Sequence, residues 1–107
     1  MFVTKIEECE IGKGWEAIVE PLLVYANANG INIMQIKTKF AGLRVYYAHK
    51  NTFYDLYGNY TKYHTEEFDK MVAEAEGQAA VTCETCGEPG TRRTTGWFYV
   101  ACDKHIR

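Results

Sequence analysis

The chain has no long hydrophobic run and no strong excess of charge of either sign. No apolar stretch approaches the roughly 18 residues that a membrane-spanning helix needs. The first eight residues do not combine a basic region with an apolar one, as a secretory signal does. Twelve basic and fourteen acidic side chains give a net charge of −2, so the whole molecule is not a nucleic-acid-binding polycation. We therefore expect a soluble cytoplasmic protein without a membrane partner.

The sequence also lacks the usual signatures of catalysis. It contains no recognisable Ser-His-Asp arrangement, glycine-rich phosphate loop or positioned pair of carboxylates. His49 and His64 have no partner at ligand spacing, and Cys9 follows Glu7 and Glu8, whose charges disfavour a thiolate. We predict that the protein is not an enzyme, and an enzyme or enzyme subunit is the least favoured of the functions considered.

The cysteines provide the clearest positive signal. Two residues separate Cys83 from Cys86, and two residues separate Cys102 from His105. Two pairs of soft ligands at this spacing are typical of a tetrahedral Zn²⁺ site, and four protein ligands leave no position for water or substrate. The prediction is a structural Zn²⁺ cofactor. The remaining Cys9 is alone, which argues against a disulfide framework and for a reducing compartment.

Hydrophobic periodicity predicts two helices. Apolar residues at helical spacing predict the first over about 14–28, ended by Asn29-Gly30, and Pro21 is expected to kink it or to mark a new first turn. The second is predicted from Thr65 to about 77–80. Its apolar stripe comprises Phe68, Met71, Val72 and Ala75.

Between the helices, apolar and polar residues alternate from 31 to 50, which predicts a β-hairpin. A two-residue turn at Ala41-Gly42 would pair 40 with 43, 38 with 45, and 36 with 47. The inward face would then comprise Met34, Ile36, Thr38, Phe40, Leu43, Val45 and Tyr47. Residues 51 to 64 show no clean period and are interpreted as a short third strand or a long aromatic loop.

These elements predict an α+β fold in the order helix, β-hairpin, helix, followed by a C-terminal zinc ribbon or truncated treble clef. We expect residues 1–80 to form a small α+β domain, with residues 81–107 as a zinc-binding element packed on it. The fifteen residues between Cys86 and Cys102 suit a short hairpin that turns at 94–96 and returns over 97–101.

Basic residues suggest one binding surface. In the predicted register the basic residues of the first hairpin share its outer face with Tyr46, and two arginines lie beside Trp97 on the zinc hairpin. Such a surface could hold phosphates and stack a base. The alternative is a solvated strand face whose lysines protect an edge from aggregation. The candidates for nucleic-acid binding are Lys37, Lys39, Arg44, Arg92 and Arg93.

Aromatic residues suggest a second surface. Tyrosine-rich segments give rigid, amphipathic contact area and are common at interaction hot spots. The candidates for partner binding are Tyr46, Tyr54, Tyr57, Tyr60 and Trp97. The alternative is that Phe53, Tyr57 and Tyr60 cover the open end of a small core.

Three phrases, read together, resemble a known group of proteins. They are Gly14-Trp15-Glu16, the hairpin phrase at 39–46, and the zinc-ligand phrases at 83–90 and 96–105. The group consists of small, largely uncharacterised zinc-ribbon proteins encoded by bacteriophages and prophage-bearing bacteria. The resemblance implies a zinc-bearing accessory protein in the cytoplasm of a bacterial host, with four metal ligands and no catalytic residue.

The predicted function is therefore non-enzymatic. We expect an accessory protein, encoded by a phage or prophage, that binds a host protein, with inhibition of that protein as one outcome. The alternative is a nucleic-acid-binding regulator that uses the basic hairpin face and the zinc ribbon. The sequence makes no prediction of the oligomeric state.

Overall fold

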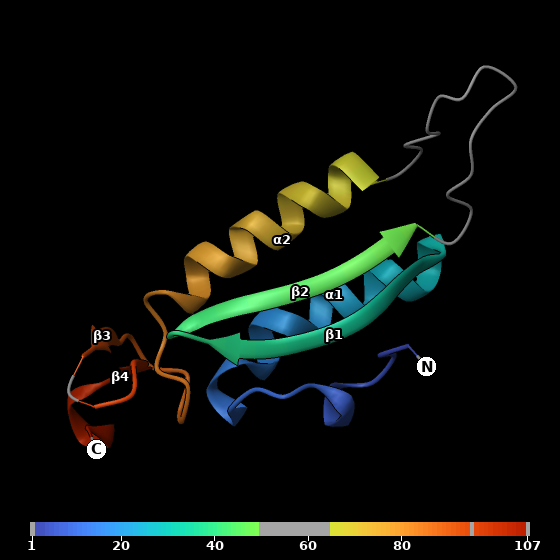
Figure 1. Ribbon diagram of the computed structural model, residues 1–107. Helices are drawn as coiled ribbons and strands as arrows, with labels where there is room; N and C mark the ends of the chain where they lie inside the picture. The colour runs from blue at the N-terminus through green and yellow to red at the C-terminus, as the bar shows by residue number, and fades with distance from the viewer. Residues whose placement is uncertain (1, 50–64, 95, 107) are drawn as a thin grey trace, which may run out of the picture.

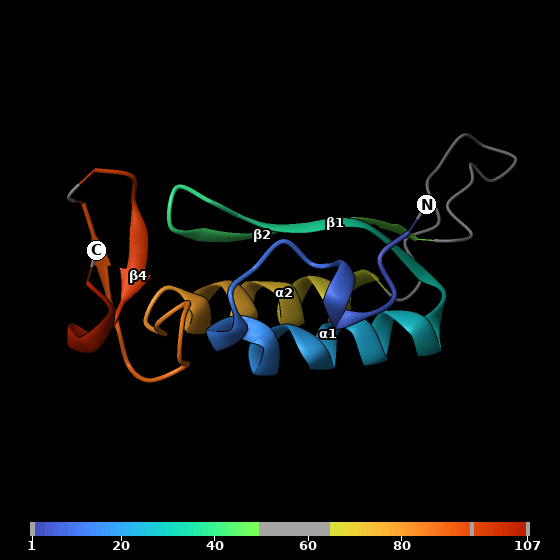
Figure 2. The same cartoon turned by 90° about the horizontal axis from the view of Figure 1, so that it is seen from below.

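Two α-helices lie under a long β-hairpin, and a second, shorter hairpin stands at one end of the molecule (Figures 1 and 2). The computed structural model describes residues 2–49, 65–94 and 96–106. Within these residues the predicted α+β class is confirmed, with two helices and two antiparallel hairpins. The interpretation of residues 51–64, and with it Tyr54, Tyr57 and Tyr60, lies outside the described residues.

The regular elements follow one another in a simple order. The helices are α1 (Glu16–Asn29) and α2 (Thr65–Ala79), and the strands are β1 (Ile31–Lys39), β2 (Gly42–His49), β3 (Thr91–Arg93) and β4 (Tyr99–Ala101). Three short 3₁₀ turns are η1 (Ile6–Glu8), η2 (Lys13–Trp15) and η3 (Asp103–His105). Neither α1 nor α2 combines the length and apolar character that a bilayer crossing requires.

Helix α1 is one continuous helix, although Pro21 lies in its second turn. Proline has no N–H to donate, so one internal hydrogen bond is lost without ending the helix. The helix buries Val19, Leu22, Leu23 and Ala26 on one face, the spacing that an amphipathic helix requires. Gly30 ends it in the left-handed conformation, at φ 69°, as predicted from the Asn-Gly stop signal.

The core lies between the hairpin and the two helices. Trp15, at the start of α1, and Phe68, on α2, are each 0 % exposed, and Ile36 and Leu43 face them from the hairpin. The predicted stripe on α2 is oriented inward, because Phe68, Val72 and Ala75 are buried and Met71 packs against the cluster. Burial of this apolar area is the main stabilising contribution to this part of the chain.

The predicted register of the first hairpin is wrong, because the turn lies one residue earlier in the chain than predicted. The turn residues are Phe40 and Ala41, so Lys39 pairs with Gly42 and Ile36 pairs with Val45. Both turn residues have positive φ, 52° and 63°, which matches the twist of a two-residue hairpin turn but costs a non-glycine residue about 1–2 kcal/mol. Ala41 is only 6 % exposed, so its small side chain contributes to the core.

Two residues assigned to the inward face are therefore exposed. Phe40 lies in the turn and is 52 % exposed. Met34 is 49 % exposed because the pairing shifts between Ile33 and Gln35. Such a bulge exchanges the inward and outward positions along the strand, and Ile33 is buried in place of Met34.

The N-terminal segment covers the outer edge of β1, which the periodicity did not predict. Val3 donates a backbone hydrogen bond to Ile33, and the backbone of Glu10 bonds to both Ile36 and Thr38. An uncovered edge offers free N–H and C=O groups to other chains. The segment therefore protects this side of the hairpin.

Candidate functional site

The four predicted ligands come together at the C-terminal end of the molecule. The thiol groups of Cys83, Cys86 and Cys102 and a ring nitrogen of His105 all lie within 4.8 Å of one another. Sulfur and imidazole donors in this number suit a metal ion such as zinc. The residues therefore form a cluster that could hold a metal.

The distances in the cluster fit a tetrahedral site. The Cys86 and Cys102 sulfurs are 3.7 Å apart, and Cys83 Sγ lies 3.7 Å from His105 Nδ1. Zn–S bonds of about 2.3 Å and Zn–N bonds of about 2.0 Å place donor atoms roughly 3.5–3.8 Å apart at tetrahedral angles. The pair of Cys102 Sγ and His105 Nδ1 is closer, at 3.1 Å. It is Nδ1 of His105 that faces the sulfurs.

Two local turns present the ligand pairs. The first is a tight turn in which Gly87 N donates to Cys83 O and Gly87 has φ 83°, a conformation that favours glycine. The second is η3, where His105 N donates to Cys102 O and brings two side chains three residues apart onto one side. These turns explain the two-residue spacing in each pair.

The first turn favours a thiolate at Cys83. Burial raises the pKa of this thiol, but hydrogen bonds from the backbone N–H groups of Cys102, Cys86 and Thr85, together with one from the Cys86 side chain, outweigh burial and lower the pKa to about 6. A thiolate is the form that binds a metal. The backbone therefore prepares Cys83 as a ligand at neutral pH.

Glu84 joins this turn to the second hairpin, a role that no sequence signal indicated. Its side chain is only 8 % exposed, and Oε2 accepts a hydrogen bond of 2.7 Å from Val100 N. Its own N–H donates to Val100 O at 3.0 Å. A buried carboxylate needs such donors, so Glu84 fixes β4 beside the first ligand pair.

The same turn docks tightly on the start of α1. Gly14 N donates to Glu84 O at 2.8 Å, and Trp15 Nε1 donates to Thr82 O at 2.8 Å. A Cβ atom on Gly14 would lie 2.0 Å from Cys83 O, and one on Gly12 would lie 2.2 Å from Glu84 O. Only glycine permits this approach, so the ligand turn and the N-terminal body are packed backbone to backbone.

One side of the cluster faces solvent. A cavity of about 520 Å³ is lined by Cys86, Cys102 and His105, together with residues around them. Cys83, by contrast, is 0 % exposed. A metal at this position would be held from the inner side by the buried ligand and reached by chelators from the outer side.

The tips of the two hairpins meet through one aromatic contact. The rings of Phe40 and Trp97 stack, with centroids 6.1 Å apart and planes 28° apart. Trp97 is 75 % exposed and Phe40 52 % exposed, so most of both rings is open to solvent. Large exposed aromatic groups of this kind mark interaction sites more often than isolated apolar residues do.

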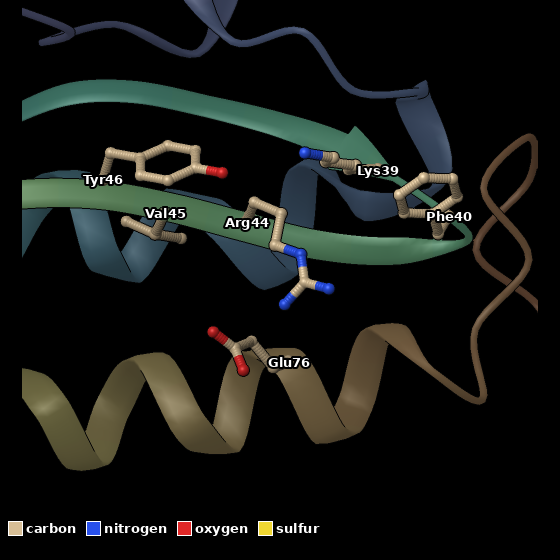
Figure 3. Close-up of a pocket in the computed structure, with 6 residues that line it drawn as sticks. All are labelled: Lys39, Phe40, Arg44, Val45, Tyr46 and Glu76. Atoms are coloured by element: carbon tan, nitrogen blue, oxygen red, sulfur yellow. The ribbon is translucent and has the colours of Figure 1, made fainter.

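Lysine side chains lie close to the rings of Phe40 and Tyr46. Lys39 Nζ lies 5.7 Å from the centre of the Phe40 ring, and Lys37 Nζ lies 5.8 Å from the centre of the Tyr46 ring. A groove of about 430 Å³ runs between β2 and α2, with Arg44 turned toward Glu76 on the facing helix (Figure 3). We call this region the hairpin-tip surface; it comprises Lys37, Lys39, Phe40, Arg44, Tyr46 and Trp97.

Two further basic candidates lie on the second hairpin. The Arg92 guanidinium lies over the Phe98 ring at 4.7 Å. Arg93 pairs with Asp103 at 3.0 Å and also donates to Ala101 O, so its guanidinium connects β3 to the second ligand turn. We therefore leave Arg93 out of the hairpin-tip surface.

No family model, no curated protein and no solved structure matches the chain. The resemblance to zinc-ribbon proteins of phages and prophages remains a prediction.

Proposed function

We propose that this protein is a non-enzymatic binding protein, in which one structural Zn²⁺ holds the second hairpin in place and the hairpin-tip surface engages a macromolecular partner. The expected settings are those predicted from the sequence: an accessory protein of phage or prophage origin in a bacterial cytoplasm, acting on a host protein or on nucleic acid.

The ligand set supports the structural role of the metal. Three thiolates and one imidazole complete a tetrahedral shell, and closed shells of this composition are typical of structural rather than catalytic zinc. Cys83, Cys86, Cys102 and His105 would hold the ion, with His105 ligating through Nδ1. The ion would supply rigidity to a segment whose strands are only three residues long.

The stacking of Phe40 on Trp97 is the observation that carries the binding role. One ring belongs to the hairpin that packs on the helices, and the other to the hairpin that the metal would organise. Keeping both rings largely exposed sacrifices the stabilisation that their burial would give. A partner that covers them would recover it.

A pull-down from bacterial lysate tests this proposal. The baits are the zinc-loaded wild-type protein, Trp97→Ala, Phe40→Asn and the control Phe2→Ala, which removes an aromatic side chain that is 47 % exposed in the N-terminal segment. We expect wild type and Phe2→Ala to retain the same protein or nucleic acid, and both hairpin-tip variants to lose it. Equal retention by all four baits would exclude the hairpin-tip surface as the binding site.

A further inference from the structure

We propose that the hairpin-tip surface binds single-stranded nucleic acid, with bases stacking on Trp97, Phe40 and Tyr46 and with phosphates held by Lys37, Lys39 and Arg44. This inference rests on the proposed function and specifies its ligand. It depends on the composition of the surface, on its charge balance and on the conformation of Phe40.

The composition matches what single strands require. Proteins that bind them combine exposed aromatic rings, on which unpaired bases stack, with cations that follow the backbone. Here Lys39 Nζ lies over the Phe40 ring and Lys37 Nζ lies over the Tyr46 ring, at 5.7 and 5.8 Å from the ring centres. Each of these two rings therefore has a cation next to it. Rings and cations alternate on this surface as bases and phosphates alternate along a single strand.

The charge balance favours nucleic acid over a protein partner. Within the described part of the chain, Arg93 and Asp103 form the only ion pair, so Lys37, Lys39 and Arg44 are not ion-paired there. Arg44 is turned toward Glu76 across the groove without pairing with it (Figure 3). The whole chain carries a net charge of −2, so these cations are a local exception. Lysine is depleted at protein–protein interfaces, whereas it commonly contacts phosphates.

The conformation of Phe40 points in the same direction. Phe40 occupies a left-handed turn position, at φ 52°, where asparagine or glycine is preferred. Its ring is 52 % exposed, so core packing does not explain its presence. The ring stacks on Trp97 and leaves the rest of its surface to solvent, and a ligand that covers this surface would account for a strained residue here.

The test is fluorescence anisotropy with a labelled oligothymidylate of about 12 nucleotides and the zinc-loaded full chain. We expect binding whose affinity falls roughly 18-fold between about 50 and 200 mM salt, the dependence for about three phosphate contacts on a single strand. Quenching of tryptophan emission should accompany binding in wild type and disappear in Trp97→Ala, because Trp15 is 0 % exposed.

Variants separate stacking from charge. Phe40→Asn and Trp97→Ala should each weaken binding by about fivefold to a hundredfold. Arg44→Gln should lower the salt slope by about 0.7, and Lys70→Gln, a lysine on the exposed side of α2, should leave it unchanged. Glu76→Gln removes the acid that lines the groove and should strengthen binding about twofold or more.

Three outcomes would overturn the inference: no binding at about 50 mM salt, tighter binding of a duplex of the same length, or equal binding by wild type and Phe40→Asn. If the oligonucleotide fails but a nuclease-treated pull-down still captures a protein that Trp97→Ala and Phe40→Asn lose, the proposed function stands and only the nucleic-acid ligand is wrong. If all four baits retain the same material equally, both the hairpin-tip binding site and its nucleic-acid ligand are wrong.

Discussion

The first hairpin has strands of nine and eight residues, whereas each strand of the second has three. The first contributes Ile33, Ile36 and Leu43 to the main apolar cluster beneath it. The second contributes Val100 to this main cluster, and Tyr99 and Ala101 to a small cluster with Cys83. Two short strands are not stable alone in water. The first hairpin is stabilised by apolar burial, whereas the second would need the proposed metal as well.

The contact between the regions is backbone to backbone. Gly14 and Glu84 are hydrogen bonded, and Trp15 reaches across to Thr82. The apolar body and the element that carries the four candidate ligands therefore share one closely packed junction. Trp97 of the second hairpin stacks on Phe40 of the first, so the hairpin-tip surface is built from both regions.

Replacing a ligand should separate the two regions most strongly. In Cys86→Ser, a hydroxyl replaces a thiolate ligand, so we expect the metal to be lost and residues 81–106 to unfold, since a structural Zn²⁺ supplies on the order of 10 kcal/mol of apparent binding free energy. Native mass spectrometry reports the metal content and amide hydrogen exchange reports the unfolded region. The β1–β2 hairpin should remain protected.

Cys9→Ser is the matched control for that variant, because Cys9 lies outside the cluster. It should retain one metal per chain and the exchange pattern of wild type. Full metal content in Cys86→Ser would contradict the ligand assignment. Loss of protection throughout β1 and β2 would show that burial alone does not hold the first region.

The junction should be the next most sensitive point. In Gly14→Ala the new Cβ would meet Cys83 O at 2.0 Å and Gly87 N at 2.6 Å, so the backbone must move. We expect a loss of about 3 kcal/mol in the free energy of unfolding, measured by urea denaturation. The metal affinity should fall as well, because the same atoms belong to the first ligand turn.

Gly77→Ala provides the comparison for Gly14→Ala. Its Cβ meets nothing within 4 Å, and it lies in α2. Alanine has the higher helix propensity, so we expect a gain of up to about 1 kcal/mol. A large loss at Gly14 beside a small gain at Gly77 would support the junction, whereas similar small effects at both positions would argue against it.

A substitution in the turn of the first hairpin should stabilise the protein, in contrast to Gly14→Ala. Phe40→Asn places a residue that tolerates positive φ in the left-handed position at φ 52°, and we expect the free energy of unfolding to rise by about 0.5–1 kcal/mol. Thermal and urea denaturation measure this change. Marked destabilisation would mean that the contact with Trp97 holds the two hairpins together, and that Phe40 is primarily structural.

Sequence patterns predicted the elements better than their connections. The helical period of α1 and the spacing of Cys83, Cys86, Cys102 and His105 are local, and the structure agrees with them. The register failed because the turn uses Phe40 and Ala41, which no turn preference favours, and because a bulge at Met34 shifts the strand.

The long-range contacts had no sequence signature. The buried carboxylate of Glu84 lies between two ligands, yet its partner Val100 is sixteen residues away. The close approach of Gly14 to Cys83 joins segments that lie far apart in the chain. Periodicity describes which face of an element is apolar, but not which backbone atoms of another element will meet it.

The smallest effect at neutral pH concerns the cysteines themselves. Burial and the nearby charges of Glu8, Glu20 and Glu16 raise the pKa of Cys9 to about 11 from an ordinary value of 9.0. At about pH 8 its thiolate fraction should therefore be roughly a hundredfold lower than that of a free thiol, and its reaction with a disulfide reagent correspondingly slow. After chelation of the metal, the three ligand cysteines should react quickly while Cys9 remains slow.

Because the pKa of Cys9 is higher in the folded protein than in the unfolded chain, the stability that this thiol contributes is fully present below pH 9 and declines as the pH rises toward 11. Urea denaturation across this range should show a shallower decline in Cys9→Ala than in wild type. Rapid reaction of Cys9 before chelation would mean that the burial of this thiol in the apolar region does not protect it.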